Sequence, residues 1–378
     1  PGPLLWGRLA SAAMRLSQAS VLDTEARVQC YVDDPILVAL GHSRKERTRI
    51  FARYLLLWVA LGFQLSWNKA KRGTDLAWIG VQLTLSGRWN RDLTVHLTAA
   101  KKEKLWDMLS EVRRCRGVIP VRVLQTATGI LSWIGNIIPM ARPWVSMLWA
   151  VLLQAQKGDE PVKETTRTRK GLVFVKQVEH AITWLFEMLK ATSTDQVCLR
   201  RVFRWKESSP TVLIQTDACP TGMGGFLMMH GRPVAFWADQ LQESDLQRFR
   251  AVQGDPSFQS EWELLAIHVS IRLFGQVVKG GWTQMLVRSD STSALQAALS
   301  FKARSPIMNY LAAEVALELE ANQLEMLWGQ HVPGADNVIA DALSRLCSGH
   351  DVPQFLAQCS RLHAPIRDAT YFRAWPHI

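Results

Sequence analysis

After Pro210, strand-like and helix-like segments follow one another in an order that few folds can accommodate. Three short apolar runs come first, followed by a helical pattern, a strand, two helical patterns, a strand and a last helix. Short apolar runs bounded by turn residues are typical of buried strands, and strands mixed with helices build α/β sheets. The sequence therefore predicts an α/β domain over residues 210–348, with a five-stranded mixed sheet. The expected strands lie at 211–217, 224–229, 233–237, 284–289 and 324–328.

Four acidic residues lie at or near the ends of these segments. Asp217 and Asp290 each end a strand, Glu263 lies in the first helix, and Asp341 lies just inside the last helix. Strand ends and helix starts meet at one edge of an open sheet, so these acids are expected to converge. Carboxylates that are buried together without partners repel each other, and divalent cations remove that cost. Two Mg²⁺ ions, or Mn²⁺ as a substitute, can then activate water and hold the leaving oxygen of a phosphodiester.

The segments that carry these acids are "TDACPTGMGG", "ELLAI", "RSDSTSAL" and "HVPGADNVIADALSR". Their order and separations resemble those of type 1 ribonuclease H, in particular the version that is fused to retroelement reverse transcriptases. The resemblance implies that Asp217, Glu263, Asp290 and Asp341 bind two magnesium ions. It also implies that His331 helps the product leave or shuttles a proton. Asn337 lies between His331 and Asp341 in the last segment and completes the pattern.

Each acid taken singly also fits an ordinary structural role. Asp217 and Asp290 could be turn or N-cap residues, which are places that Asp side chains favour. Glu263 could be an ordinary helix acid, and Glu261 is a rival for its role, although Glu263 directly precedes the apolar Leu-x-Ala face. Transposases and 3′–5′ exonucleases share the broad fold. They differ because transposases place a Glu last, and the exonucleases pair Asp and Glu within one strand motif.

The first part of the chain contains "CYVDDPILV", which reads as two short strands around a turn that carries Asp33 and Asp34. It resembles the Tyr-x-Asp-Asp hairpin of the reverse transcriptase palm. The later segments "LGFQLSWNKAKRG" and "LAWIGVQL" resemble the motifs that follow that hairpin. Residues 98–156 resemble the helical thumb, with "TGILSWIGNIIPMARPW" similar to the thumb motif of DIRS-like and related retroelements.

This resemblance implies a role for several residues of a polymerase remnant. Asp33, next to Tyr31, would bind a metal ion, and Asp34 would support the site from the opposite face of the strand. Lys69, or failing that Lys71, would protonate pyrophosphate. An Asp pair at a turn is also common for purely local reasons, because Asp forms hydrogen bonds with nearby backbone groups.

The first part departs from the reverse transcriptase pattern in two ways. Pro35 directly follows the Asp pair, and proline is tolerated at a strand start or edge but not within a ladder. The family's other essential Asp lies well upstream with the fingers, and only about 30 residues precede Tyr31 here. Asp23 is too close to replace it. The polymerase site is therefore expected to be incomplete, unless the natural chain, which here begins with Pro1, extends further.

A net charge of +11 and a pI near 9.6 favour a polyanionic partner, with nucleic acid first and an acidic membrane surface second. The apolar runs are too short to span a bilayer, and no leader segment opens the chain. A basic amphipathic helix from Thr98 onward is expected either to contact phosphates or simply to be solvated. Its basic residues include Lys101, Lys102, Lys104, Arg113 and Arg114.

Six cysteines without any Cys-x-x-Cys pair argue against a disulfide framework and fit a reducing compartment, nuclear or cytoplasmic rather than secreted. Cys347, His350, Cys359 and His363 are all zinc-ligand types, but their spacing matches no common zinc module.

Together these features predict a fragment of an LTR or DIRS-like retrotransposon polyprotein. We expect Mg²⁺-dependent hydrolysis of the RNA strand of RNA–DNA hybrids and binding of template-primer, with no membrane and no small-molecule cofactor; the oligomeric state is open. The alternatives are a decayed element that only binds nucleic acid, and a full RNA-directed DNA polymerase if the natural chain is longer. The expected parts are a partial palm (1–97), a helical thumb (98–156), a linker (157–209), the RNase H-like domain (210–348) and a C-terminal tail (349–378).

Overall fold

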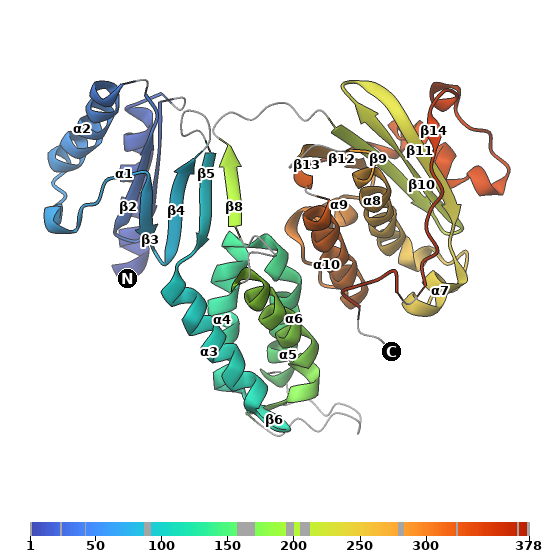
Figure 1. The fold of residues 1–378 in the computed structure, drawn as a ribbon, viewed down its shortest axis with the longest axis horizontal. Coiled ribbons are helices and arrows are strands. Elements are labelled where there is room, and N and C mark those ends of the chain that lie inside the picture. Colours follow the sequence, from blue (N-terminus) through green and yellow to red (C-terminus); the bar gives the residue numbers. More distant parts are fainter. Residues whose placement is uncertain are drawn as a thin grey trace. The chain divides into compact units, whose positions relative to one another are not determined.

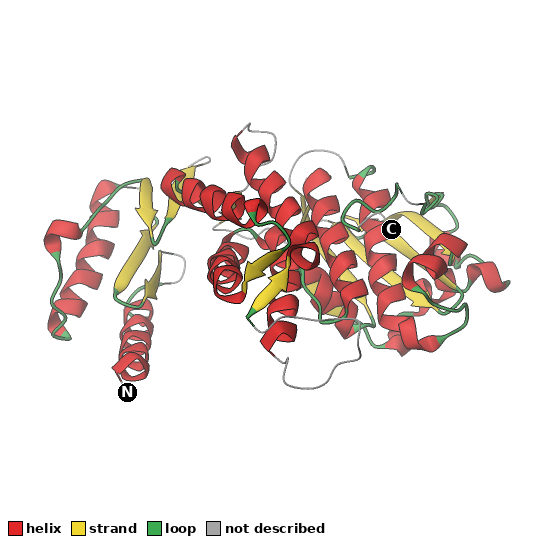
Figure 2. Ribbon diagram, turned by 90° about the horizontal axis from the view of Figure 1, so that it is seen from below, coloured by secondary structure: helices red, strands yellow, loops and turns green. Residues whose placement is uncertain are grey.

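The computed structural model describes residues 2–22, 25–41, 43–86, 92–156, 171–193, 200–204, 212–278, 283–322, 324–368 and 370–375. The protein has a mixed α/β structure (Figure 2). It divides into two compact units. The first contains Pro1–Lys102 and Arg200–Trp205, and the second contains Glu103–Leu199 and Lys206–Ile378. Just under half of the expected linker (157–209) lies outside the described residues, namely 157–170, 194–199 and 205–209.

Antiparallel pairs form the sheets of the first unit. Strands β1 and β2 form a hairpin in which Tyr31 pairs with Asp34, and β3, β4, β5 and β8 form a four-stranded sheet in that order (Figure 1). The elements are α1 (Gly2–Ala19), β1 (Ala26–Tyr31), β2 (Asp34–Ala39), α2 (Arg44–Ala60), η1 (Trp67–Lys69), β3 (Asp75–Trp78), β4 (Val81–Ser86), β5 (Asp92–Leu97) and β8 (Arg200–Arg204).

Helix α2 begins with a side-chain cap. The Ser43 side chain accepts a hydrogen bond from the Glu46 N–H, and the Glu46 side chain accepts one from the Ser43 N–H, which makes a capping box. Tyr54 and Trp58 of this helix pack with Val28 of β1 in a small core. Helix α2 thereby covers the hairpin that carries Asp33 and Asp34.

Helices come first in the second unit, and α3 buries Leu105, Leu109 and Val112 along one face. Helix α6 begins at Val175. Before it, Leu172–Phe174 is a short strand that pairs with Val118–Pro120, since β-branched and aromatic residues suit strands. The elements are α3 (Ala99–Arg114), β6 (Val118–Pro120), α4 (Val121–Ile137), η2 (Pro139–Ala141), α5 (Arg142–Gln156), β7 (Leu172–Phe174) and α6 (Val175–Ser193).

A mixed sheet forms the centre of the rest of this unit, in the order β13-β12-β9-β10-β11-β14. The expectation of five strands was wrong, because Ser360–Arg361 adds a sixth strand parallel to β11. The elements are β9 (Val212–Cys219), β10 (Gly222–Met229), β11 (Arg232–Gln240), α7 (Glu243–Phe249), η3 (Pro256–Phe258), α8 (Gln259–Gly275), β12 (Thr283–Ser289), α9 (Thr292–Ser300), α10 (Pro306–Ala321), β13 (Leu324–His331), η4 (Gly334–Asp336), α11 (Val338–Ser344), η5 (Leu346–Ser348), η6 (Gln354–Leu356) and β14 (Ser360–Arg361).

Helices cover both faces of this sheet. A Cβ on Gly224 would lie 2.6 Å from the Leu343 Cβ of α11, and a Cβ on Gly225 would lie 2.7 Å from the Ser270 Oγ of α8. Because neighbouring strand residues point to opposite faces, α8 and α11 lie on opposite sides of β10. The glycines of "TGMGG" thus let α11 approach the sheet closely.

The segment after Gly349 packs on this domain. Tyr371, Phe372 and Trp375 belong to the same core as the sheet and α8. The fully buried Arg367 forms ion pairs with Asp245 and Asp239 at 2.8 Å, so the last residues fasten α7 to the sheet.

None of the described helices combines the length and apolarity that a bilayer crossing needs. The five cysteines among the described residues are free thiols.

Candidate metal centre

Two of the predicted acids come from neighbouring parallel strands. Strand β12 pairs with β9 in a register that sets Val287 opposite Ile214 and Arg288 opposite Gln215. Continuing that register by two residues places Asp290 beside Asp217. Asp290 directly follows β12, and Asp217 lies two residues before the end of β9, so both acids are at the same edge of the sheet.

Glu263 reaches the same place from the second turn of α8. Its side chain is 2% exposed, and three groups hold it. Oε1 accepts hydrogen bonds of 3.1 Å from the Ala218 N–H and from Gln259 Nε2, and Oε2 accepts one of 3.2 Å from Ser289 Oγ. These donors fix both carboxylate oxygens at the edge of the sheet.

The carboxylates of Asp217, Glu263 and Asp290 form one cluster, in which one oxygen of each lies within 4.8 Å of the others. It is the only group of three or more potential metal ligands at such distances within the described part of the chain. None of the three forms an ion pair with a described Lys, Arg or His. Hard carboxylate oxygens without a cation suit Mg²⁺ or Mn²⁺, so the cluster can bind a divalent metal ion.

The electrostatics of the cluster agree with this donor set. Burial raises the pKa of Asp217 to about 6, and the charges of Asp290 and Asp341 add to the rise. Burial, followed by the charges of Asp217 and Asp290, raises the pKa of Glu263 well above its ordinary value. Burial also raises the pKa of Asp290. Negative charge is therefore unfavourable here, as expected where a cation is needed to balance it.

The fourth predicted acid, Asp341, is near this cluster but outside it. Its charge raises the pKa values of Asp217 and Asp290. Its own Oδ1 forms an ion pair with Arg345 Nη2 at 2.7 Å, one helical turn later, and accepts a second bond from Nε at 3.0 Å. The Asp341 side chain is 39% exposed, so this pair lies at the rim of the site.

His331 and Glu261 occupy the surroundings of the cluster. His331 ends β13, is exposed, and lies close enough for its charge to lower the pKa of Asp290. Glu261 Oε1 accepts a hydrogen bond of 3.1 Å from Ser305 Oγ and is not part of the metal-ligand group. Glu263, and not Glu261, is therefore the helix acid that belongs to the cluster.

Sequence patterns did not predict the side chains that hold the acids. Gln259 and Ser289 bind Glu263, and Gln215 joins Asn337, whose side chain donates to Asp217. Gln259 lies four residues before Glu263 on α8, so helical spacing was a usable signal for that pair. For Gln215 and Ser289 no local signal exists.

The residues of the expected polymerase remnant are all exposed on the first unit. Asp33 lies in the hairpin turn, Tyr31 and Asp34 flank it, and Lys69 ends η1. None of them belongs to a metal-ligand cluster among the described residues. Val32 has a φ of 59°, a strained backbone conformation for a β-branched residue. Its carbonyl accepts a 2.9 Å hydrogen bond from Trp6 Nε1, which supports the turn.

The basic residues of α3 differ in their surroundings. Lys104 and Arg114 are exposed, whereas Lys101 and Lys102 are partly buried. The exposed Arg113 has its guanidinium 4.3 Å from the centre of the Phe186 ring. Arg113 thus packs on α6, and Lys104 and Arg114 are the better placed to meet a phosphate.

The cysteine and histidine residues near the C-terminus do not form a metal-ligand group among the described residues. Cys347 and His350 are exposed, and burial raises the pKa of the Cys359 thiol. With His363 they stay apart from the carboxylate cluster.

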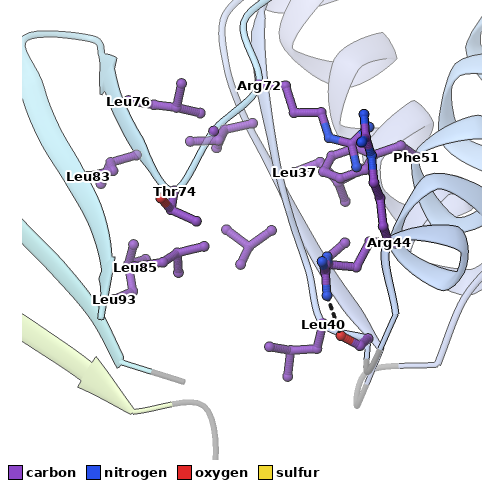
Figure 3. Close-up of a pocket in the computed structure, with 16 residues that line it drawn as sticks. Leu37, Leu40, Arg44, Phe51, Arg72, Thr74, Leu76, Leu83, Leu85 and Leu93 are labelled. Atoms are coloured by element: carbon purple, nitrogen blue, oxygen red, sulfur yellow. Dashed lines mark hydrogen bonds between the residues drawn. The ribbon is translucent and has the colours of Figure 1, made fainter. Parts of the chain in front are cut away.

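A pocket of about 500 Å³ lies in the first unit between β2 with α2 and strands β3 to β5 (Figure 3). Leucine side chains such as Leu37 and Leu85 line it from both sides, and Arg44, Arg47 and Arg72 also line it. No acidic side chain lines it, and neither do the residues of the expected polymerase remnant. It is therefore a separate feature of this unit.

Comparisons with known proteins give structural likenesses only. No protein-family model and no curated protein match the sequence. A foamy viral protease-reverse transcriptase in complex with an RNA/DNA hybrid is 13% identical, with a TM-score of 0.36 over 86% of this chain and 38% of that chain. The viral protein in complex with dsDNA is 13% identical, with a TM-score of 0.34 over 88% of this chain and 59% of that chain.

RNase H1 from the halophilic archaeon Halobacterium salinarum NRC-1 is 20% identical, with a TM-score of 0.27 over 35% of this chain and 92% of that chain. The chain spans less than two thirds of the length of the two viral structures. Because all these TM-scores are below 0.5, the function of this chain is argued from its own residues.

Proposed function

We propose that this chain is a metal-dependent ribonuclease H that hydrolyses the RNA strand of RNA–DNA hybrids, and that it is a fragment of a retroelement reverse transcriptase. The observation that carries the proposal is the cluster of Asp217, Glu263 and Asp290, in which one oxygen of each lies within 4.8 Å of the others. Two of these acids lie at one edge of adjacent parallel strands, and Glu263 comes from helix α8. The resemblance of the four motif segments to type 1 ribonuclease H supports an RNA–DNA hybrid as the substrate.

The cluster would hold one divalent cation, and Asp341 would help to hold a second. When bound, such ions lower the pKa of a water molecule and stabilise the attacking and leaving oxygens of a phosphodiester. Other residues of the chain orient the carboxylates that would hold the ions. The Ala218 N–H and Ser289 Oγ hold one oxygen each of Glu263, and the buried position of Asp217 keeps bulk water away from it.

His331 would act at the rim of the same site. It is exposed at the end of β13, where Ser289 is its neighbour on β12. An imidazole ring can accept and release protons near neutral pH. Its ring would exchange a proton with the leaving group or help the cut strand depart.

The positive charge of the chain supports a nucleic-acid partner. A net charge of +11 attracts phosphates without reading sequence, and this attraction weakens as salt rises. Exposed basic residues on α3, namely Lys104 and Arg114, would contribute to binding of the hybrid or of template-primer.

A panel of labelled duplexes of one sequence tests the proposal. The chain with Mg²⁺ should cut the RNA strand of an RNA–DNA hybrid and leave double-stranded DNA and double-stranded RNA intact. A chelator should stop the reaction. Equal cutting of double-stranded DNA, or cutting that continues in the chelator, would refute the assignment.

A further inference from the structure

Asn337 occupies a helix-capping position but uses its side chain elsewhere. It directly precedes α11, and an Asn there usually accepts a hydrogen bond from the first N–H groups of its own helix. The Asn337 side chain makes no such bond. It is fully buried, and it reaches strand β9, more than a hundred residues earlier in the chain.

The contacts on β9 use both ends of the Asn337 amide. Nδ2 donates to the Thr216 carbonyl at 3.2 Å and to Asp217 Oδ1 at 3.0 Å. Oδ1 accepts a bond of 2.7 Å from Gln215 Nε2. Because Gln215 can only donate through this nitrogen, it fixes the amide with its NH₂ group toward Asp217.

The backbone of Asn337 is hydrogen-bonded to Asp341, the fourth acid. Its carbonyl accepts a 2.9 Å hydrogen bond from the Asp341 N–H. One residue therefore contacts the carboxylate of Asp217 through its side chain and the helical turn of Asp341 through its backbone.

We propose that Asn337 is a positioning residue of the metal centre, which orients the Asp217 carboxylate and sets its place relative to Asp341. This inference rests on the proposed function, in which these acids bind metal ions. A neutral amide suits the task, because it donates a hydrogen bond to a carboxylate without displacing the cation as a Lys or Arg would. Residues that hold metal ligands in this way typically change metal affinity by about 10- to 100-fold when they are replaced.

The test is the affinity of the full chain for Mn²⁺, measured by titration without nucleic acid. Asn337→Ala should fold, as judged by circular dichroism, and bind Mn²⁺ about 10- to 100-fold more weakly. The matched control is Asn309→Ala, a buried Asn of α10 that donates to the Pro143 carbonyl and accepts from the Ala303 N–H. The control loses a similar number of hydrogen bonds away from the carboxylates and should keep the Mn²⁺ affinity.

A cleavage assay adds a readout that a merely structural role would not change. High Mn²⁺ should restore the rate of Asn337→Ala toward that of the wild type, because the defect lies in metal binding. If Asn337→Ala fails to fold, Gln215→Met is the second variant. It removes the hydrogen bond that fixes the Asn337 amide while Asn337 itself stays in place, and it should also weaken Mn²⁺ binding. Unchanged Mn²⁺ affinity in the folded variant would overturn the inference.

The outcomes also separate this inference from the proposed function. A wild-type chain that binds Mn²⁺ and loses affinity in Asn337→Ala, yet cuts no hybrid, would refute the hydrolase and keep the positioning role. A wild-type chain that binds no Mn²⁺ would overturn both.

Discussion

Glu263 accepts a hydrogen bond of 3.1 Å from the backbone N–H of Ala218, the residue directly after Asp217. This bond joins helix α8 to the end of strand β9, so the carboxylate of one ligand is fixed by the backbone beside another. The donor belongs to the main chain and is present whatever side chain occupies position 218. The distance between the two acids is thus set by the packing of helix α8 against strand β9, and it does not depend on the side chain at position 218.

Removal of metal should make stability depend on pH through Asp217. Its pKa is about 6 in the folded state against 3.8 ordinarily, so the folded state binds the proton more tightly than the unfolded chain does. In a chelator, the free energy of unfolding should therefore fall as pH rises from about 4 to about 6. Asp217→Asn removes this loss and should be more stable than the wild type above that window, by about 1–3 kcal/mol.

Chemical denaturation at about pH 4 and about pH 7 measures this difference. The control is Asp336→Asn, which removes an exposed acid of η4 outside the cluster. A stability difference between Asp217→Asn and the wild type that is the same at both pH values would contradict the account.

Arg345→Gln should strengthen metal binding. In the metal-free protein the Arg345 side chain holds Asp341 Oδ1 in an ion pair, and a metal ion at Asp341 must displace it. The pair is half exposed, so its contribution is small and the Mg²⁺ midpoint should fall by less than about tenfold. A Mg²⁺ titration of hybrid cleavage gives the midpoint. A higher midpoint in Arg345→Gln would show that the arginine supports the site instead.

Arg367→Ala should destabilise the second unit strongly. Its guanidinium is fully buried against the fully buried Asp245, and removal of one partner leaves the other charge without compensation. The expected loss is about 3–5 kcal/mol in the free energy of unfolding by urea. The double variant Arg367→Met with Asp245→Leu should recover part of it. A loss below about 1 kcal/mol in Arg367→Ala would mean that the last residues do not hold α7.

Gly224→Ala should displace α11 and weaken the site. The added Cβ would lie 2.6 Å from the Leu343 Cβ and 2.9 Å from the Leu343 backbone, which cannot yield without moving the helix that carries Asp341. We expect a stability loss of about 1–3 kcal/mol together with weaker Mn²⁺ binding. Gly129→Ala on α4 meets nothing within 4 Å and should stabilise the chain by up to about 1 kcal/mol. Equal thermal midpoints for the two variants would contradict the packing argument.

The long elements of this fold follow from the sequence, and the short ones do not. Strand β9 was expected over 211–217 and is found over Val212–Cys219, because its apolar run is bounded by turn residues. Strands β6 and β7 have three residues each, and β14 has two, so no local pattern marks them. These short strands form because segments that are distant in the sequence pair with them by hydrogen bonds.

The acids of the site were predictable, whereas the groups that hold them were not. Asp217 lies near the end of β9 and Asp290 directly follows β12, and parallel neighbours end at one edge of a sheet. The ion pair of Asp341 with Arg345 follows the i, i+4 rule and was available from spacing alone. The bond between Asn337 and Asp217 depends on how α11 docks on β9, which a sequence pattern does not reveal.

Cleavage of the RNA strand of an RNA–DNA hybrid in Mg²⁺ by Asp290→Asn tests the central claim most directly, since Asp290 is the least buried acid of the cluster and its isosteric replacement disturbs packing little. The wild type and the control Asp336→Asn should cut at the same rate, and Asp290→Asn should show no cleavage while its thermal midpoint stays near that of the wild type. Cleavage by Asp290→Asn at the wild-type rate, or no cleavage by the wild-type chain, would contradict the account.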